Sequence, residues 1–192
     1  GHGVLIPRPE TELIVETAVQ KGPFFQMADL GCGSGCIGLS LLGEFKDSRL
    51  WACDISDEAA TYFEENAKRL NFMDRISFSL GDVSAIKAEN KYDLVVANPP
   101  YIDRHDDRVG EDVRKHEPGL ALFAEDNGLA FYKAWLPWAQ RALKAGGWVM
   151  MEFGEGQSSD IFKMAQASGF RNVEIKKDLS GKERMLCAQK DS

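Results

Sequence analysis

The sequence predicts an α/β protein in which a mostly parallel sheet carries helices on both faces. Segments with the apolar pattern of strands alternate along the chain with segments of helical periodicity, the order that builds strand–helix–strand units. A turn at Ser180–Gly181 joins the last two expected strands, so we expect a closing antiparallel hairpin. The expected sheet has seven strands, at residues 27–30, 50–54, 76–80, 92–97, 148–153, 171–177 and 183–189.

The helices are predicted from apolar spacing and from residues that begin or end a helix. Residues 9–21 read as a helix because Pro9 suits a first turn and apolar residues follow at helical spacing. Ser56 is a suitable N-cap for a helix over 57–70. The other expected helices are 37–45, 128–144, which Gly146–Gly147 would end, and 157–168. The polar residues 103–118 predict a long loop.

Length and composition narrow the class of protein. With 192 residues and 44% hydrophobic content, the chain is long enough for one domain with a sizeable core, spanning residues 1–192. It holds no run of about 18 apolar residues, so we expect no membrane association and a cytoplasmic location. The net charge of −7 disfavours stable nucleic-acid binding, which needs clustered Lys and Arg. The four cysteines form no CxxC pair, so we expect no metal site.

A glycine-rich turn follows the first expected strand. The segment Asp29–Gly38, DLGCGSGCIG, places glycines at 31, 33, 35 and 38, where a strand passes into a helix. Glycines allow a tight turn and the close approach of a ligand to free backbone N–H groups of the helix. Residues 33–38 match the GxGxxG pattern of dinucleotide sites, and residues 29–35 match the acidic-x-GxGxG pattern of S-adenosylmethionine sites. The loop alone leaves both ligands open.

Two further acidic residues follow the second and third expected strands. Asp54 ends the second strand, and a carboxylate there binds a ribose diol in either kind of site. Asp82 follows the third strand and can accept from the exocyclic amine of an adenine, while the Val83 backbone N–H can donate to the ring. The alternative interpretation of Asp82 is a simple loop or helix cap.

The fourth expected strand ends in Asn98-Pro99-Pro100-Tyr101. In an open parallel sheet such a strand end lies in the same crevice as the glycine loop. The Asn98 side-chain carbonyl and the Pro99 backbone carbonyl can each accept one N–H of a planar NH2 group, and the Tyr101 ring can hold its plane. The two bonds leave the nitrogen lone pair directed at a methyl donor. The alternative interpretation is a rigid turn that ends the strand.

These motifs resemble the HemK/PrmC family of peptide-chain release factor glutamine methyltransferases, whose catalytic domain has the class I methyltransferase Rossmann-like fold. The resemblance covers nearly the whole chain. The matching segments are LIPRPETE (5–12), DLGCGSGCI (29–37), DIS (54–56), VANPPYI (96–102), EPGLALFAEDNGL (117–129) and EFGEGQ (152–157). The family usually carries a small helical domain before the Pro-Arg-Pro segment, so we expect a catalytic-domain fragment or a shortened relative.

The resemblance implies an enzyme that transfers a methyl group from S-adenosylmethionine to the N5 nitrogen of the glutamine in the Gly-Gly-Gln motif of release factors, leaving S-adenosylhomocysteine. Asn98, Pro99 and Tyr101 would be catalytic. The same three residues and Pro100 would bind the glutamine. Arg8 and Thr11 would lie near the crevice, in contact with substrate or only in packing. The residues expected to contact the cofactor are Asp29, Gly31, Cys32, Gly33, Ser34, Gly35, Asp54, Ile55, Asp82, Val83 and Asn98.

Two other functions remain open at this stage. Adenine-N6 and guanine-N2 nucleic-acid methyltransferases carry a similar NPPY slot, and Tyr101 can stack on a flipped base. A nicotinamide-dependent oxidoreductase or a nucleotide-binding module would use the glycine loop and Asp54 and leave NPPY without a role. Cofactor binding separates the last class from the first two.

Overall fold

The computed structural model of the chain describes residues 4, 8–103 and 119–191. Seven strands form the main sheet, and two short ones form a separate pair. The strands are β1 Gln26–Leu30, β2 Arg49–Asp54, β3 Ile76–Leu80, β4 Tyr92–Ala97, β5 Ile102–Asp103, β6 Phe123–Ala124, β7 Leu143–Glu152, β8 Phe170–Lys177 and β9 Glu183–Lys190.

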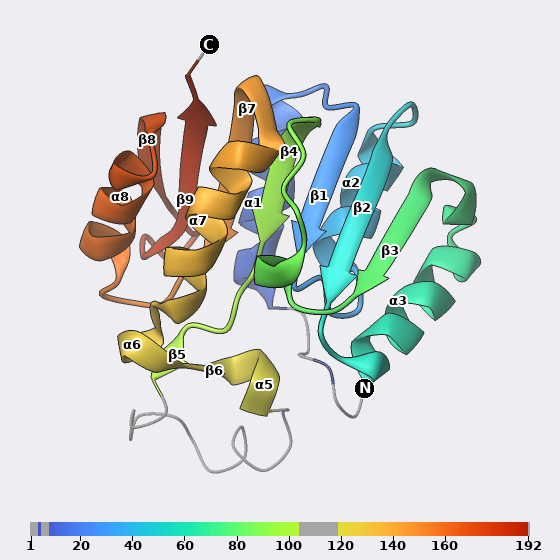
Figure 1. Cartoon of the computed structure of the whole chain (residues 1–192), viewed down its shortest axis with the longest axis horizontal. Coiled ribbons are helices and arrows are strands. Elements are labelled where there is room, and N and C mark those ends of the chain that lie inside the picture. Colours follow the sequence, from blue (N-terminus) through green and yellow to red (C-terminus); the bar gives the residue numbers. More distant parts are fainter. Residues whose placement is uncertain (1–3, 5–7, 104–118, 192) are drawn as a thin grey trace.

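The strand order of the main sheet is β3-β2-β1-β4-β7-β9-β8. The first five strands in this order are parallel, and β9 pairs antiparallel with both β7 and β8. Figure 1 shows the carboxyl ends of β1, β2, β3 and β4 at one edge, facing the segment that holds β5, β6 and α5. The predicted class, a mostly parallel sheet closed by an antiparallel hairpin, is confirmed.

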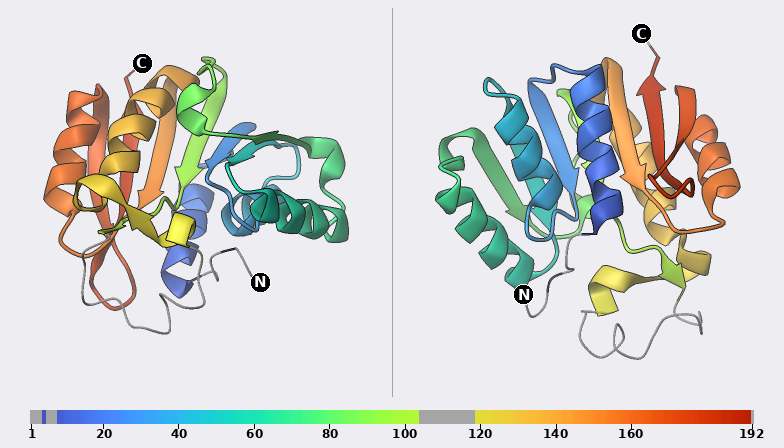
Figure 2. Two further views of the ribbon diagram at one scale, coloured as in Figure 1. Left: turned by 60° about the horizontal axis from the view of Figure 1, so that its bottom comes forward. Right: turned by 180° about the vertical axis from the view of Figure 1, so that it is seen from behind.

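Helices cover both faces of the sheet, as expected. The α-helices are α1 Glu12–Lys21, α2 Cys36–Glu44, α3 Asp57–Arg69, α5 Gly119–Leu122, α6 Glu125–Gly128, α7 Ala130–Ala142 and α8 Ser158–Ala167. The 3-10 helices are η1 Pro9–Thr11, η2 Met73–Arg75 and η3 Val83–Ala85. In Figure 1 α7 and α8 lie in front of the sheet, and the reverse view in Figure 2 shows α1, α2 and α3 on the other side.

The alternation of side chains along the strands gives each face its own apolar core. Val95, Val149 and Leu186 belong to the cluster that α7 covers with Tyr132 and Trp135. The residues that alternate with them on the same strands belong to the opposite cluster, which α1, α2 and α3 complete; those strand residues are Leu94, Val96, Met150, Met185 and Cys187. Burial of β4 on both faces explains why its sequence is apolar almost throughout.

Local sequence signals placed most elements within a few residues. Ser56 caps α3 as predicted, because its side-chain oxygen accepts from the Ala59 backbone N–H at 3.2 Å. The helix predicted over 9–21 is present as η1 followed by α1.

The predicted role of Gly146–Gly147 as the end of a helix is wrong. Helix α7 ends at Ala142, and both glycines lie inside β7. The pairing of β4 with β7 is irregular here, between Tyr92 and Leu94. A Cβ on Gly147 would lie 3.2 Å from the Asp93 carbonyl oxygen, so the glycine permits the close approach of the two strands.

The expected loop over 103–118 is only partly open to comparison. Residues 104–118 lie outside the described residues, and with them Glu117 and Pro118. Asp103 belongs to β5, which pairs in parallel with β6, so the loop assignment is wrong at that residue. The sequence analysis did not anticipate this pair, because two-residue strands carry no periodic pattern.

The described residues show neither a membrane-spanning helix nor a metal-ligating cluster. In that part of the chain, no helix combines the length and hydrophobicity that crossing a membrane requires. The same residues contain no cluster of three His, Cys, Asp or Glu side chains that could hold a metal ion.

Candidate active site

The candidate site lies at the point where the strand order reverses. Strands β1 and β4 are neighbours, but the chain leaves β1 toward β2 on one side and continues from β4 toward β7 on the other. The crevice outside the carboxyl ends of two such strands is the usual ligand site of open α/β sheets. The glycine loop follows β1 at Gly31, and Asn98 follows β4, so the fold brings both predicted motifs to this crevice (Figure 1).

The glycine loop has a backbone that only glycine adopts easily. Gly31, Gly33 and Gly35 have φ angles of +66°, +54° and +84°. A Cβ on Gly35 would lie 2.7 Å from the Phe63 ring and 2.8 Å from Leu39 Cδ1, so the loop is also packed closely from below. The Gly31 and Cys32 N–H groups donate to the Cys53 carbonyl, which ties the loop to β2.

Asp54 supports the loop from the end of β2. One carboxylate oxygen accepts from the Gly33 backbone N–H at 2.8 Å, and the other accepts from the Ser56 N–H at 3.0 Å. Each oxygen keeps further acceptor capacity for a ligand hydroxyl. The neighbouring Ile55 side chain is 63% exposed, which leaves an apolar surface beside this carboxylate.

Asp29 is buried beneath the loop. Its Oδ2 accepts from the Gly38 backbone N–H at 2.9 Å, so the carboxylate links β1 to the first turn of α2. Burial raises the pKa of Asp29 to about 7, and the nearby charge of Asp54 adds to the rise. The structure therefore gives Asp29 a role in shaping the loop.

The other predicted cofactor residues occupy varied surroundings. Asp82 caps η3, since its Oδ1 accepts from the Ser84 N–H at 2.8 Å, and Val83 is buried. This is the cap that the sequence left as an alternative for Asp82. The Ser34 carbonyl accepts from Asn66 Nδ2 at 2.9 Å, and Cys32 is buried with a pKa raised by burial.

Asn98 holds one half of its side-chain amide in a hydrogen bond and leaves the other half without one. Its Nδ2 donates to Thr11 Oγ1 at 3.2 Å. Among the described residues, the Asn98 Oδ1 atom is buried and has no hydrogen-bond partner. A buried acceptor without a donor costs free energy of about 1–3 kcal/mol, which a ligand N–H can recover. Pro99, the next residue, is buried and provides only a carbonyl.

Glu152, at the end of β7, is a site residue for which the sequence analysis proposed no role. Ala97 pairs with Met151, so Asn98 and Glu152 come next on adjacent strands. Glu152 is buried; its Oε2 accepts from the Thr11 hydroxyl at 2.7 Å and its Oε1 from the Tyr101 hydroxyl at 3.3 Å. A polar residue at the end of a buried strand is the signal that singled out Asp54 and Asn98. The strand expected over 148–153 placed Glu152 before the apolar Phe153, inside the strand, so the same signal did not mark it.

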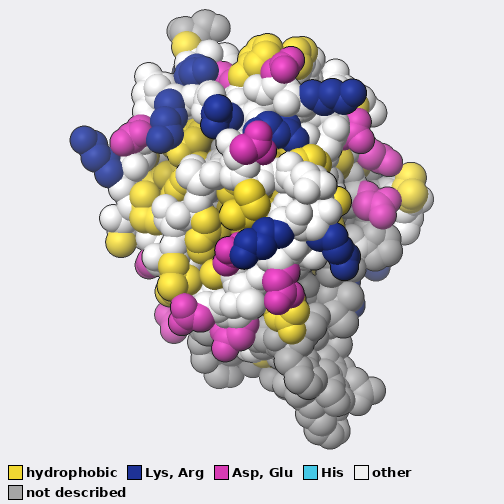
Figure 3. Space-filling model, turned by 90° about the vertical axis from the view of Figure 1, so that its right-hand side faces the viewer, with side chains coloured by type: hydrophobic (Ala, Val, Ile, Leu, Met, Phe, Trp, Pro, Cys, Tyr) yellow, Lys and Arg dark blue, Asp and Glu magenta, His cyan; other side chains and the backbone are white. Residues whose placement is uncertain are grey.

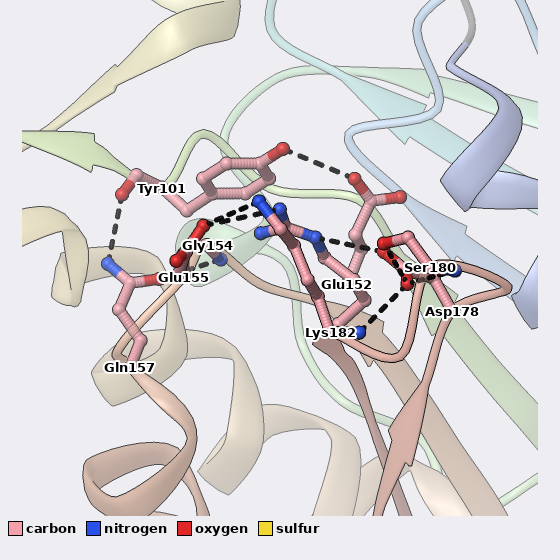
Figure 4. Close-up of polar contacts among 9 residues, drawn as sticks. Tyr101, Glu152, Gly154, Glu155, Gln157, Asp178, Ser180 and Lys182 are labelled. Carbon is pink, nitrogen blue, oxygen red and sulfur yellow. Dashed lines mark hydrogen bonds and ion pairs between the residues drawn. The ribbon is translucent and has the colours of Figure 1, made fainter. Parts of the chain in front are cut away.

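Tyr101 is held on several sides by the segment after β7 (Figure 4). Gln157 Nε2 donates to the Tyr101 backbone carbonyl at 2.9 Å, and Gln157 Oε1 accepts from the Gly154 N–H at 2.9 Å. A Cβ on Gly154 would lie 2.9 Å from the Tyr101 ring, so the ring packs directly on that glycine.

Burial shifts the acid–base behaviour of this cluster. Burial raises the pKa of Tyr101. Burial, with the nearby Glu10 adding to it, also raises the pKa of Glu152, and the hydrogen bonds from the Thr11 and Tyr101 hydroxyls offset part of that rise. Tyr101 therefore stays protonated and acts as a donor.

Comparison with known proteins identifies the family. The model of the methyltransferase small domain matches residues 9–115. A release factor glutamine methyltransferase of Caulobacter vibrioides is 39% identical over 100% of this chain and 68% of its own length. One of Clostridium acetobutylicum is 35% identical over 97% of this chain and 67% of its own length. The chain belongs to the release factor glutamine methyltransferase family. It spans about two thirds of the length of these relatives.

This chain shares its fold with solved structures of other methyltransferases. A ribosomal protein L11 methylase of Lactobacillus delbrueckii superposes with a TM-score of 0.70 at 21% identity, over 98% of this chain and 82% of that one. An S-adenosylmethionine-dependent O-methyltransferase of Thermotoga maritima gives 0.70 at 15% identity, over 97% and 67%. At these identities the likeness concerns the fold alone.

Family membership confirms the predicted enzyme class and cofactor: the chain is an S-adenosylmethionine-dependent methyltransferase. The crevice fits that cofactor. Asp54 retains acceptor capacity for ribose hydroxyls, and Gly31, Gly33 and Gly35, with positive φ, have no side chain that would cover the loop backbone at their positions. The family model and the relatives favour the methyltransferase class over the nicotinamide-dependent oxidoreductase that the glycine loop alone left open.

Proposed function

We propose that this chain transfers a methyl group from S-adenosylmethionine to the N5 nitrogen of the glutamine in the Gly-Gly-Gln motif of peptide-chain release factors. The observation that carries the proposal is the buried, unpartnered Oδ1 of Asn98. A primary carboxamide supplies the N–H donor that this oxygen lacks. The names of the relatives support the same substrate.

The slot would bind the glutamine amide through acceptors only. Asn98 Oδ1 would accept one N–H, and the Pro99 backbone carbonyl would accept the other. An amide nitrogen is a poor nucleophile because its lone pair is delocalised. Two accepted hydrogen bonds raise electron density on the nitrogen and favour the pyramidal geometry of attack.

When bound, S-adenosylmethionine supplies a methyl group already activated by its sulfonium. The chain then has to place the nitrogen in line with that group, and alignment alone can lower a barrier by up to roughly 7–11 kcal/mol. Both oxygens of Glu152 are engaged by Thr11 and Tyr101, so we do not assign it as a base. The extra proton would leave to water after transfer.

Nucleic-acid amino-methylation is the weaker alternative. The names of the relatives point to a protein substrate. On the face formed by the β3–α3 edge, Figure 3 shows Lys and Arg interspersed with Asp and Glu among the residues described. A surface that follows a phosphate backbone needs a groove of one positive sign. We propose release factors as the partner, and hence a reaction in the cytoplasm, where release factors act.

The test is methyl transfer from labelled S-adenosylmethionine to a purified release factor. The control is the same factor with its Gly-Gly-Gln glutamine changed to alanine, and duplex DNA serves as a competing substrate. We expect label on the unmodified factor only. Label on DNA, or equal label on both factors, would overturn the proposal.

A further inference from the structure

Four polar side chains from distant parts of the sequence form one hydrogen-bonded network. Asn98 donates to Thr11, and Thr11 and Tyr101 each donate to one oxygen of Glu152. Thr11 ends η1, Asn98 and Tyr101 follow β4, and Glu152 ends β7. Figure 4 shows the Tyr101 hydroxyl pointing at the Glu152 carboxylate. This network therefore connects η1, β4 and β7 at the acceptor slot, the place beside Asn98 and Pro99 where the substrate amide would bind.

With Glu152 ionised, a count of protons determines the direction of every hydrogen bond in this network. An ionised carboxylate has no proton, so Glu152 can only accept. The Thr11 hydroxyl has a single proton, and it goes to Glu152 Oε2 at 2.7 Å. Thr11 Oγ1 then offers only lone pairs to Asn98. The Asn98 amide must turn its NH2 group toward Thr11, since its oxygen would meet those lone pairs and be repelled.

The same count decides what Asn98 presents to a substrate. With Nδ2 directed at Thr11, Oδ1 is the atom left over, and it is one of two buried side-chain atoms without a partner among the described residues, the other being Asp29 Oδ1. A flipped amide would present NH2 instead. Two NH2 groups facing each other cannot form the hydrogen bond that the proposed reaction needs.

We propose that Glu152, acting through Thr11, is a positioning residue that keeps the Asn98 amide in its acceptor-forward orientation. This inference rests on the proposed function, because it concerns how the same slot recognises a primary amide. Neither Thr11 nor Glu152 touches the substrate in this account. Their role is to remove the one alternative orientation in which the slot would reject an N–H donor.

The burial of Glu152 agrees with this role. Removing a carboxylate from water is costly, and the partners described for this one are two hydroxyl groups. An amide or apolar side chain at the end of β7 would avoid that cost, but only an acceptor-only group forces the Thr11 proton away from Asn98. Tyr132 adds precision, because its hydroxyl donates to the Glu152 backbone carbonyl at 2.6 Å.

The test compares Thr11→Val with Thr11→Ser in the full chain, with methylation of a release factor as the assay. Valine keeps the shape and removes the hydroxyl, so we expect kcat to fall about 100-fold, as expected for a misaligned reacting group. Serine restores the hydroxyl, and we expect kcat within about threefold of the parent chain. The dissociation constant for S-adenosylmethionine should stay within twofold in both variants, which also shows that they fold.

Thr17→Val is the matched control. Thr17, on α1, is also a buried threonine, and it lies outside the hydrogen-bonded network of Thr11, Asn98, Tyr101 and Glu152. We expect its kcat to remain within about twofold of the parent value, since Thr17 takes no part in the hydrogen bonds that join Thr11, Asn98, Tyr101 and Glu152. An equal loss in Thr17→Val and Thr11→Val would mean a general packing effect and would overturn the proposal.

The link between Glu152 and Thr11 is tested by combining variants. Glu152→Gln can donate an N–H to Thr11, which frees the Thr11 proton for Asn98 Oδ1, so we expect a loss of about 30–100-fold in kcat. The double variant should be no slower than Thr11→Val alone, because both changes act through one bond. Multiplied losses, or an active Thr11→Val enzyme, would overturn the inference. If Thr11→Val does not fold, the Thr11→Ser and Glu152→Gln variants test the positioning role instead.

The proposed function is tested separately from the positioning role. It depends on whether the parent chain labels the glutamine of the release factor at all. Label from the parent chain with full activity in Thr11→Val would reject only the positioning role.

Discussion

The two halves of the crevice are built in different ways. On the β1–β2 side, Asp54 and Asp29 bind backbone N–H groups of Gly33 and Gly38, so carboxylates hold a glycine loop in place. On the β4–β7 side, Asn98 and Glu152 are joined to each other through the Thr11 side chain. The first half leaves a backbone surface for the cofactor, with the buried Asp29 Oδ1 unpartnered beneath it. The second half leaves Asn98 Oδ1 without a partner among the described residues.

The difference follows from what each half must recognise. A loop made of backbone can bind one cofactor in proteins of very different sequence, and solved structures at 15–21% identity still share this fold. The acceptor half draws on residues 11, 98, 101 and 152. Its selectivity depends on hydrogen-bond direction, so single side chains should matter more there than in the loop.

The largest effect is expected from Asn98→Ala, which removes the acceptor from the slot. We expect kcat to fall by about 1,000-fold, comparable to the loss of a positioned polar group in other active sites. The affinity for S-adenosylmethionine, measured by calorimetry, should change by less than about threefold, because Asn98 lies on the acceptor half. Unchanged turnover would contradict the difference between the two halves.

Asp54→Ala should show the opposite pattern. Loss of a charged acceptor costs about 1.5–3 kcal/mol, so cofactor binding should weaken by about 10–100-fold. At saturating cofactor, kcat should stay within about fivefold, because the acceptor slot is intact. Asp54→Asn, which keeps one acceptor oxygen, is the control and should lose less affinity. Equal cofactor affinity in the alanine variant would remove Asp54 from the binding half.

Asp29 should make stability depend on pH. Its pKa in the folded chain is about 7, above the usual 3.8, so the folded chain binds this proton more tightly than the unfolded chain. The stabilisation is complete below the usual pKa and is lost as the pH rises toward 7. Asp29→Asn lacks this titration. Relative to it, the parent chain should lose about 2–3 kcal/mol between about pH 5 and pH 8.

Urea unfolding of both chains without cofactor at the two pH values provides that measurement. A constant difference between parent and Asp29→Asn would show that this carboxylate titrates normally.

The smallest effect is expected from Ser56→Ala, which removes the cap of α3. The free energy of unfolding should fall by about 1 kcal/mol, the usual value of such a cap. Because α3 packs on the apolar cluster of α1 and α2, away from Asn98, kcat should be unchanged within error. Urea unfolding and a methylation assay test both halves of the prediction. A drop in kcat without a drop in stability would mean that α3 affects the acceptor slot directly.

The sequence predicted features that depend on local chemistry. The strand–helix alternation, the Ser56 cap and the glycine loop each follow from neighbouring residues, and the structure contains them. It also predicted that Asn98 and the loop meet, because parallel strands place their carboxyl ends at one edge.

The features that were missed depend on contacts between distant segments. Gly146–Gly147 resembles a helix end, yet the close approach of Asp93 on β4 makes it part of a strand. The bond from Thr11 to Glu152 joins residues 141 positions apart, and no local pattern marks it. The pair β5–β6 forms through two residues on each side, which is too short for any periodicity.

The central claim is that Asn98 Oδ1 receives an N–H of the substrate amide. The most direct measurement is a structure of the chain with S-adenosylhomocysteine and a peptide containing Gly-Gly-Gln. The account predicts the glutamine amide nitrogen at about 2.9 Å from Asn98 Oδ1, the normal length of such a bond, with Asn98 Nδ2 still on Thr11. A glutamine side chain bound elsewhere, or facing the NH2 group of Asn98, would contradict it.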